Sequence, residues 1–282
     1  MEALQKILGK VSSTEFTYDP TDEEAKERFL ADSWNREIGN LNEDDGYSCE
    51  ECHNKGTLWT VGQRPDGHWT TFSRPCKCMT VRRTIKRMQR SGLKNIIKEY
   101  TFDKYHATEP WQQTIKDAAE QYAREPSGWF FIGGQSGAGK THICTAICRE
   151  FLLAGKEVRY MLWRDEIVKI KQVVNDFEQY QQIMAPYKET EILYIDDLFK
   201  SGKEPDGSTQ QPSRGDINAI FEILNGRYND PKKLTIISSE CTINDIVDID
   251  EALGGRIYER ARVLNLKPDK RRNYRLKGAI DI

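Results

Sequence analysis

The stretch Gly134-Gln135-Ser136-Gly137-Ala138-Gly139-Lys140-Thr141 decides the fold of this chain. Its spacing is that of a phosphate-binding loop, in which glycines let backbone N–H groups turn toward phosphate oxygens at the start of a helix. Lys140 can reach the β- and γ-phosphates of a nucleotide, and the Thr141 hydroxyl can bind Mg²⁺. An apolar run at residues 129–132 precedes the loop, as the motif requires. These residues therefore predict an ATP site between a strand and a helix.

Apolar runs alternate with helical patterns on both sides of this loop. Strands are expected at 129–132, 157–162, 192–195, 234–238 and 263–266, and helices at 111–124, 140–153, 164–185, 214–228 and 243–260. Strand–helix alternation of this kind predicts a parallel sheet that is covered on both faces. We therefore expect one α/β ATPase domain over residues 99–282, with a mobile polar loop at 200–213.

Two carboxylates follow the third expected strand, in Ile192-Leu193-Tyr194-Ile195-Asp196-Asp197. A phosphate-binding loop needs an acid at the end of a neighbouring strand to hold Mg²⁺. Asp196 is predicted to bind the magnesium ion through its water shell. Asp197 is predicted to polarise the attacking water as a general base.

Four cysteines predict a zinc module ahead of the ATPase domain. They form the pairs Cys49-x2-Cys52 and Cys76-x-Cys78, separated by 23 residues. Four thiolates suit a closed tetrahedral Zn²⁺ site, and strand patterns at 57–61 and 68–72 could form a hairpin between the pairs. Free cysteines, an iron–sulfur cluster, or replacement of one thiolate by His53 or His68 are the alternatives.

The net charge of −2 hides an uneven distribution. Residues 1–47 carry twelve acidic and five basic side chains, whereas residues 74–98 carry nine basic ones and no acid. We expect an acidic helical segment at 1–46 and a zinc module with a basic helix at 47–98. The basic side chains could contact DNA phosphates or form a solvated face. They are Arg82, Arg83, Lys86, Arg87, Arg90 and Lys94.

Aromatic side chains in the cysteine region allow two interpretations. Trp59, Trp69 and Phe72 could stack on nucleic-acid bases, or they could form the small core of the zinc module. The second interpretation is the more common one for such a small module.

The composition, with 38% hydrophobic and 30% charged residues, is typical of a soluble globular protein. No apolar run approaches the roughly 18 residues of a membrane-spanning helix, and no secretory signal pattern is present at the first residues. We therefore expect a cytoplasmic protein without a membrane partner.

Three motifs together resemble the DnaC/DnaI helicase loaders, which are AAA+ ATPases. They are Lys140-Thr141-His142, the strand ending Asp196-Asp197, and Gly255-Arg256-Ile257-Tyr258-Glu259-Arg260. The IstB transposition ATPases share much of this pattern. The resemblance covers about 100–282 and extends to 47–99 through a phage and prophage variant that carries a cysteine cluster. The first 45 residues resemble nothing we can name.

The resemblance implies an AAA+ domain with a five-stranded parallel sheet, and an arginine finger for a neighbouring subunit. Arg256 is the first candidate for the finger and Arg260 the second, and a surface arginine is the alternative for each. The family usually has Asn at the end of its fourth strand, where this chain has Glu240. Either Ser239 senses the γ-phosphate, or ATP turnover is slow.

The same resemblance implies a loader that binds a replicative hexameric helicase, helps place it on single-stranded DNA, and self-associates with ATP. One alternative is a transposition helper ATPase of the IstB type. The other is a nucleotide-gated binding switch with negligible turnover, which Glu240 would favour.

Overall fold

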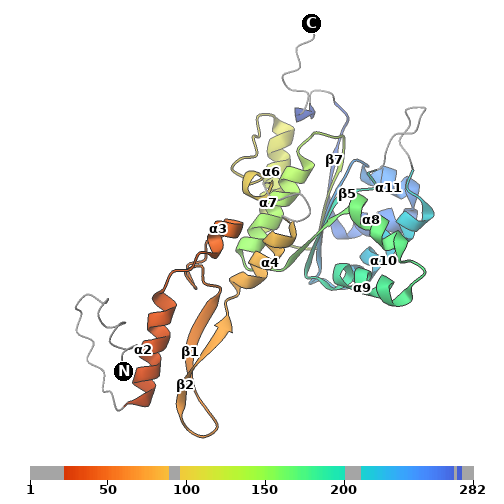
Figure 1. Ribbon diagram of the computed structural model, residues 1–282. Helices are drawn as coiled ribbons and strands as arrows, with labels where there is room; N and C mark the ends of the chain where they lie inside the picture. The colour runs from red at the N-terminus through yellow and green to blue at the C-terminus, as the bar shows by residue number, and fades with distance from the viewer. Residues whose placement is uncertain (1–21, 89–95, 201–210, 270–271, 275–282) are drawn as a thin grey trace. The chain divides into compact units, whose positions relative to one another are not determined.

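The computed structural model describes residues 22–88, 96–200, 211–269 and 272–274 (Figure 1). The chain divides into two compact units, Met1–Met79 and Thr80–Ile282. Most of the expected loop at 200–213 lies outside the described residues. The three-segment division expected from the sequence, with boundaries after residues 46 and 98, stays a prediction.

The first unit combines a helix with an antiparallel hairpin. It contains α2 (Glu23–Arg36), α3 (Leu41–Asp45), β1 (Thr57–Gln63) and β2 (Trp69–Pro75), with the pairing running from Thr57↔Pro75 to Gln63↔Trp69. The ring centroids of Trp34 and Trp59 lie 4.4 Å apart. The Asn35 side chain accepts from the Trp59 N–H at 2.9 Å and donates to its carbonyl at 2.8 Å. Trp59 therefore packs the helix onto the hairpin, as a core residue of a small module does.

The second unit is built on a five-stranded parallel sheet in the order β4-β5-β6-β3-β7. Its strands are β3 (Trp129–Gly134), β4 (Val158–Leu162), β5 (Ile192–Leu198), β6 (Leu234–Ser239) and β7 (Ala261–Leu266). Its helices are α5 (Ile96–Glu99), α6 (Pro110–Arg124), α7 (Lys140–Leu153), α8 (Trp163–Gln172), α9 (Phe177–Glu189), α10 (Arg214–Tyr228), α11 (Ile243–Ile249) and α12 (Glu251–Arg260). A further helix, α4 (Cys78–Met88), contains the boundary between the units. The expected α/β fold with five parallel strands is confirmed.

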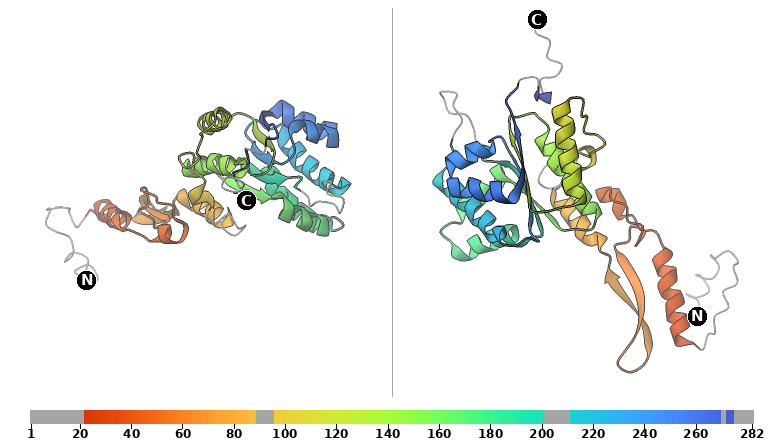
Figure 2. Two further views of the ribbon diagram at one scale, coloured as in Figure 1. Left: turned by 90° about the horizontal axis from the view of Figure 1, so that it is seen from above. Right: turned by 180° about the vertical axis from the view of Figure 1, so that it is seen from behind.

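Helices cover both faces of this sheet (Figures 1 and 2). Helices α6 and α7 lie on one side, and α8 to α12 lie on the other. Consecutive strand residues serve opposite faces. In β3, the Phe130 ring contacts Tyr122 of α6, whereas Phe131 packs in the core cluster with Ile220 of α10 and Ile257 of α12. Because β3 is buried on both faces, its sequence is an uninterrupted apolar run.

Two helices expected from periodicity are each divided in two, so these predictions are wrong in detail. The pattern at 164–185 corresponds to α8 and α9, and the pattern at 243–260 corresponds to α11 and α12. At each break an aspartate caps the second helix. The side chain of Asp176 accepts from the Gln179 N–H, and that of Asp250 accepts from the Leu253 N–H. Such side-chain bonds replace the backbone bonds of a continuous helix.

Within the described part of the chain, no helix is both long and apolar enough to span a membrane.

Candidate functional site

The phosphate-binding loop connects β3, the fourth strand of the sheet order, to the amino end of α7. Gly134, Gly137 and Gly139 have φ values of 120°, 75° and 84°, which favour glycine. A Cβ atom on Gly134 would lie 2.4 Å from the Leu266 carbonyl oxygen of β7. The glycines of the motif are therefore required by backbone geometry as well as by the approach of a phosphate.

Lys140 lies inside this loop, where its Nζ donates to the carbonyls of Gly134 and Gln135 at 2.8 Å each. Burial lowers the pKa of Lys140, while Glu240 and Asp197 act in the opposite direction. The Thr141 hydroxyl donates to Oδ1 of Asp196 at 3.1 Å. The structure thus brings together the hydroxyl and the strand-end carboxylate that the sequence predicts as magnesium ligands.

The Asp196 carboxylate accepts hydrogen bonds from three further hydroxyl groups, which the sequence did not predict. The hydroxyls of Tyr194 and Tyr160 donate to it at 2.7 Å and 3.0 Å, and the Ser238 hydroxyl also donates. Burial raises the pKa of Asp196, whereas these three hydroxyls favour its ionised form. A buried carboxylate beside a threonine hydroxyl fits Mg²⁺, a cation that takes oxygen ligands.

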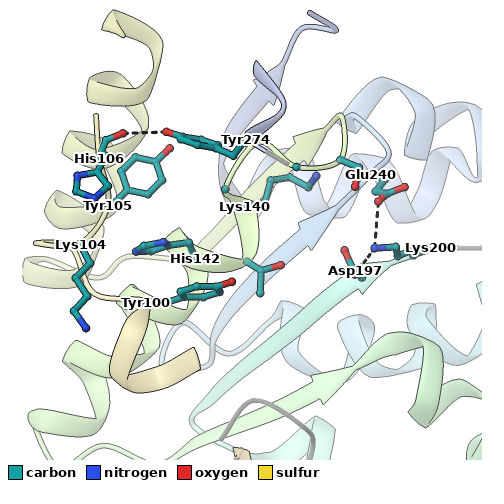
Figure 3. A pocket seen from close by; sticks show the side chains of 14 residues that line it. Tyr100, Lys104, Tyr105, His106, Lys140, His142, Asp197, Lys200, Glu240 and Tyr274 are labelled. Carbon is teal, nitrogen blue, oxygen red and sulfur yellow. Dashed lines mark hydrogen bonds and ion pairs between the residues drawn. The ribbon is translucent and has the colours of Figure 1, made fainter. Parts of the chain in front are cut away.

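Acid and base side chains gather at the phosphate end of a pocket of about 300 Å³ (Figure 3). The Asp197 carboxylate lines this pocket, and Lys200 Nζ lies 2.8 Å from its Oδ2 atom. Glu240 also lines the pocket. The structure does not bring Ser239 there, because its buried hydroxyl donates to the Leu198 carbonyl at 2.6 Å and accepts from the Cys241 N–H. At the strand end it is therefore Glu240, and not Ser239, that lines the pocket.

Aromatic rings form the wall on the other side of Lys140 (Figure 3). The Tyr100 and His142 rings stack with centroids 4.5 Å apart, and Tyr105 meets His142 edge-on at 5.3 Å. His142 Nε2 donates to the Thr101 carbonyl at 2.8 Å, which holds the ring in place. Stacked rings beside a phosphate loop offer a flat surface for a nucleobase. No motif in the sequence indicated this wall.

Residues near the carboxyl end complete the surroundings of the loop. The Gln135 side chain bonds to both the N–H and the carbonyl of Asp269, and the Tyr274 N–H donates to the Gly137 carbonyl at 2.8 Å. The Tyr274 hydroxyl donates to the His106 carbonyl at 2.9 Å. These contacts could not be predicted from the sequence, because each joins residues more than 130 positions apart.

The model of the family described as IstB-like ATP binding protein matches residues 77–278. The chain belongs to this family. Because the family is described as ATP-binding, the expected ATPase is confirmed at the level of the family.

Three relatives each match more than two thirds of this chain. The chain is 32% identical to the uncharacterized protein YqaM of Bacillus subtilis (strain 168) over 68% of its own length and 62% of YqaM. It is 30% identical to the phage-like element PBSX protein XkdC of the same organism, over 76% of this chain and 79% of XkdC. It is 24% identical to the replicative helicase loader DnaC of Escherichia coli (strain K12), over 69% of this chain and 74% of DnaC.

One solved structure supports the fold. The crystal structure of a DnaC helicase loader superposes with a TM-score of 0.50 and 21% identity, over 60% of this chain and 97% of that chain. The resemblance to the DnaC/DnaI and IstB-like AAA+ proteins is therefore confirmed, including the likeness to a phage-type relative.

Arg256 and Arg260 lie on α12, and neither is among the described residues that line the nucleotide pocket. The Arg256 guanidinium lies over the rings of Phe221 and Tyr228 at 4.6 Å and 5.5 Å, and Arg260 lies 5.9 Å from the Tyr228 ring. Their role toward a neighbouring subunit stays a prediction.

The four cysteines of the first unit form one cluster. All four Sγ atoms lie within 4.8 Å of one another, with Cys49 and Cys76 at 3.8 Å and Cys52 and Cys78 at 3.5 Å. Tetrahedral zinc with Zn–S bonds of about 2.3 Å separates its sulfurs by about 3.8 Å, whereas a disulfide needs about 2.05 Å. The spacing therefore fits a metal site and not disulfides.

The surroundings of the cluster also fit a cation. The Gly56 N–H donates to Cys52 Sγ at 3.3 Å. Burial raises the pKa of the Cys76 thiol, so a cation would be needed to keep this sulfur as a thiolate. Within the described chain, the metal-binding group contains neither His53 nor His68. His68 instead lies 3.3 Å from a Glu23 carboxylate.

The basic helix is only partly available to phosphates. Arg82 is buried, which its place in the basic stretch did not predict, while Arg83 and Lys86 are exposed. The side chains of Arg87, Arg90 and Lys94 lie outside the described residues.

Proposed function

We propose that this protein is an ATP-dependent helicase loader, which binds a replicative hexameric DNA helicase and helps place it on single-stranded DNA. The observation that carries the proposal is a nucleotide site with paired Thr141 and Asp196, in a chain related to a replicative helicase loader. ATP binding would control the self-association of the loader. The protein would act in the cytoplasm, where the helicase works.

In this proposal each site residue has one role in ATP hydrolysis. Thr141 and Asp196 hold Mg²⁺, and Lys140 with the loop N–H groups binds the β- and γ-phosphates. Asp197 takes a proton from the water that attacks the γ-phosphorus, and the bond to the β–γ bridging oxygen breaks to give ADP and phosphate. Arg256, or Arg260 as second candidate, stabilises the charge on the phosphate of a neighbouring subunit.

The first unit and helix α4 supply the remaining parts of the proposal. The cysteine cluster of the first unit binds Zn²⁺, and this folded module contacts the helicase. The exposed Arg83 and Lys86 of α4, which belong to the second unit, contact single-stranded DNA through its phosphates. No membrane partner is proposed.

The test uses the purified replicative helicase of the host and a closed circle of single-stranded DNA. We expect the protein to co-elute with the helicase when ATP is present and to increase the amount of helicase retained on the circle. Lys140→Ala, which removes the phosphate-binding cation, should abolish the ATP-dependent part. No co-elution under any nucleotide condition would contradict the loader role.

The family description favours one competing function, a helper ATPase of a transposase. A parallel assay with the transposase of an IstB-type element separates the two, because a helper should bind the transposase and leave the helicase unbound. ATP-dependent binding of the helicase without measurable phosphate release would instead identify a nucleotide-gated switch.

A further inference from the structure

Lys200 lies between two acids at the phosphate end of the nucleotide pocket (Figure 3). Its ammonium nitrogen lies 2.8 Å from Asp197 Oδ2 and 3.2 Å from Glu240 Oε1. All three side chains line the same pocket as Lys140 and Thr141. Lys200 is thus a second cation at this end of the pocket, and no sequence motif assigns it a role.

The backbone holds Lys200 in this position. Asp197 and Phe199 both have left-handed φ values, 56° and 59°, and the pairing of β5 with β6 shifts register between Ile195 and Leu198. Non-glycine residues adopt such values rarely, and they cluster at functional sites. The Phe199 ring is buried against Trp163, with centroids 5.7 Å apart. This anchored turn keeps Leu198 and Phe199 in the core while Asp197 and Lys200 face the pocket.

The positive charge of Lys200 explains how the acid Glu240 can occupy the position of a phosphate sensor. Burial alone would raise the pKa of Glu240, but a hydrogen bond from Ser136 and the cations Lys200 and Lys140 lower it. Burial would lower the pKa of Lys200, but the Asp197 and Glu240 carboxylates raise it. The pKa shifts of Glu240 and Lys200 therefore both favour the ionised forms of these two side chains. An ionised Glu240 without Lys200 would repel a γ-phosphate.

We propose that Lys200 is a γ-phosphate-binding residue, which Asp197 and Glu240 hold in the pocket until a nucleoside triphosphate arrives. The oxygens of a γ-phosphate carry more negative charge than either carboxylate, so the ammonium moves to them. Asp197 then loses its ion pair and becomes free to accept the proton of the attacking water. ADP has no γ-phosphate and leaves the ion pairs intact. This inference rests on the proposed ATP site and not on the loader role.

The first test compares the dissociation constants of ADP and of a non-hydrolysable ATP analogue, both with Mg²⁺. Because a charge-assisted bond to phosphate is lost, Lys200→Met should weaken analogue binding by about 10- to 100-fold and leave ADP binding unchanged. Glu240→Gln should strengthen analogue binding relative to ADP, since it removes an anion and releases Lys200.

A double variant separates phosphate binding from simple neutralisation of the acids. If Lys200 contacts the γ-phosphate, Lys200→Met should weaken analogue binding as strongly in the Glu240→Gln protein as in the wild type. If Lys200 only screens Glu240, its loss should matter little once that acid is neutral. The second result would overturn the proposal.

Lys188→Met is a matched control. Lys188 pairs with Glu222 at 2.9 Å, and their side chains are 23% and 38% exposed, close to the 29% and 36% of Lys200 and Glu240. Neither Lys188 nor Glu222 is among the described residues lining the nucleotide pocket, so this variant should bind both nucleotides as the wild type does. Thermal unfolding of every variant verifies that it is folded, and Lys200→Gln replaces Lys200→Met if the latter is not.

Failure of the proposal is distinguishable from failure of the ATP site. If the wild type binds neither nucleotide, the site itself is wrong. If the wild type binds both, Lys140→Ala binds neither, and Lys200→Met weakens ADP and analogue equally, then the ATP site stands and the role of Lys200 is overturned.

Discussion

Arg227 shows how a single buried side chain can hold the ends of several elements together. It is fully buried, and its guanidinium donates to Thr235 Oγ1 and to the carbonyls of Tyr187, Thr190 and Leu234 at 2.7–3.0 Å. Only arginine offers five donors in a fixed planar fork. It therefore joins the end of α9 to the starts of β5 and β6.

The first prediction concerns this residue. Arg227→Met leaves buried carbonyls without donors, and we expect the free energy of unfolding to fall by at least about 3 kcal/mol. Urea unfolding measures the change. Arg149→Met removes a half-exposed pair with Glu150 and should change the free energy by less than about 0.5 kcal/mol. Equal effects of the two substitutions would contradict the structural role of Arg227.

A second residue-scale prediction concerns pH. Burial lowers the pKa of His142 below its ordinary 6.5, although the hydrogen bond to Thr101 acts in the opposite direction. The unfolded chain then binds more protons than the folded one below pH 6.5, so stability falls as the pH drops through this range. We expect wild type to lose more unfolding free energy than His142→Gln between about pH 7.5 and about pH 5.5. If the free energy of unfolding changes equally with pH in the two proteins, this prediction is contradicted.

At the scale of elements, the strands of the sheet were predictable because burial on both faces leaves an apolar run. The helix breaks at Asp176 and Asp250 were not, because hydrophobic periodicity continues across both caps. The phosphate-binding loop and Asp196 could be predicted because each is a local motif with fixed chemistry. Tyr160 and Ser238 could not, because they reach Asp196 through pairing of β4 and β6 with β5.

Asp250 gives an element-scale prediction because it ends α11 and begins α12. Its N–H donates to the Ile246 carbonyl at 2.9 Å, and its side chain accepts from the Leu253 N–H at 2.8 Å. Asp250→Ala should lower the free energy of unfolding by about 1 kcal/mol, whereas Asp250→Asn should be nearly neutral, because Asn caps helices as well as Asp does. Urea unfolding of the two Asp250 variants and the wild type measures these changes. An equal loss in both variants would exclude capping as the cause.

At the scale of the whole molecule, the two compact units should respond differently to loss of metal. Where a metal site exists only in the folded state, its binding energy is folding energy. We expect about one zinc per chain, and chelation should make the first unit sensitive to protease while the second retains ATP binding. Cys78→Ser should lose the zinc. Cys241→Ser, outside the cluster, should keep it. Metal analysis that finds iron, or no metal, would contradict the zinc assignment.

The last prediction concerns assembly of several copies. Arg256 lies on α12 and packs on Phe221, and it is not among the described residues that line the pocket of its own chain. If it serves the nucleotide of a neighbour, the ATPase rate per chain should rise with protein concentration, because a lone subunit lacks the finger. An arginine finger is typically worth about 10³–10⁵ in rate, so its loss is easily measured.

Mixing two inactive variants tests this directly. Lys140→Ala lacks the phosphate-binding cation but keeps Arg256, while Arg256→Ala lacks the finger but keeps the loop. At an interface between them, one subunit supplies the site and the other supplies the finger, so mixing should restore part of the activity. Arg262→Ala, which removes an exposed contact with α6, should keep full activity alone. If both variants are folded and no mixing ratio restores hydrolysis, Arg256 does not act across subunits, and nucleotide binding within one chain must carry the function.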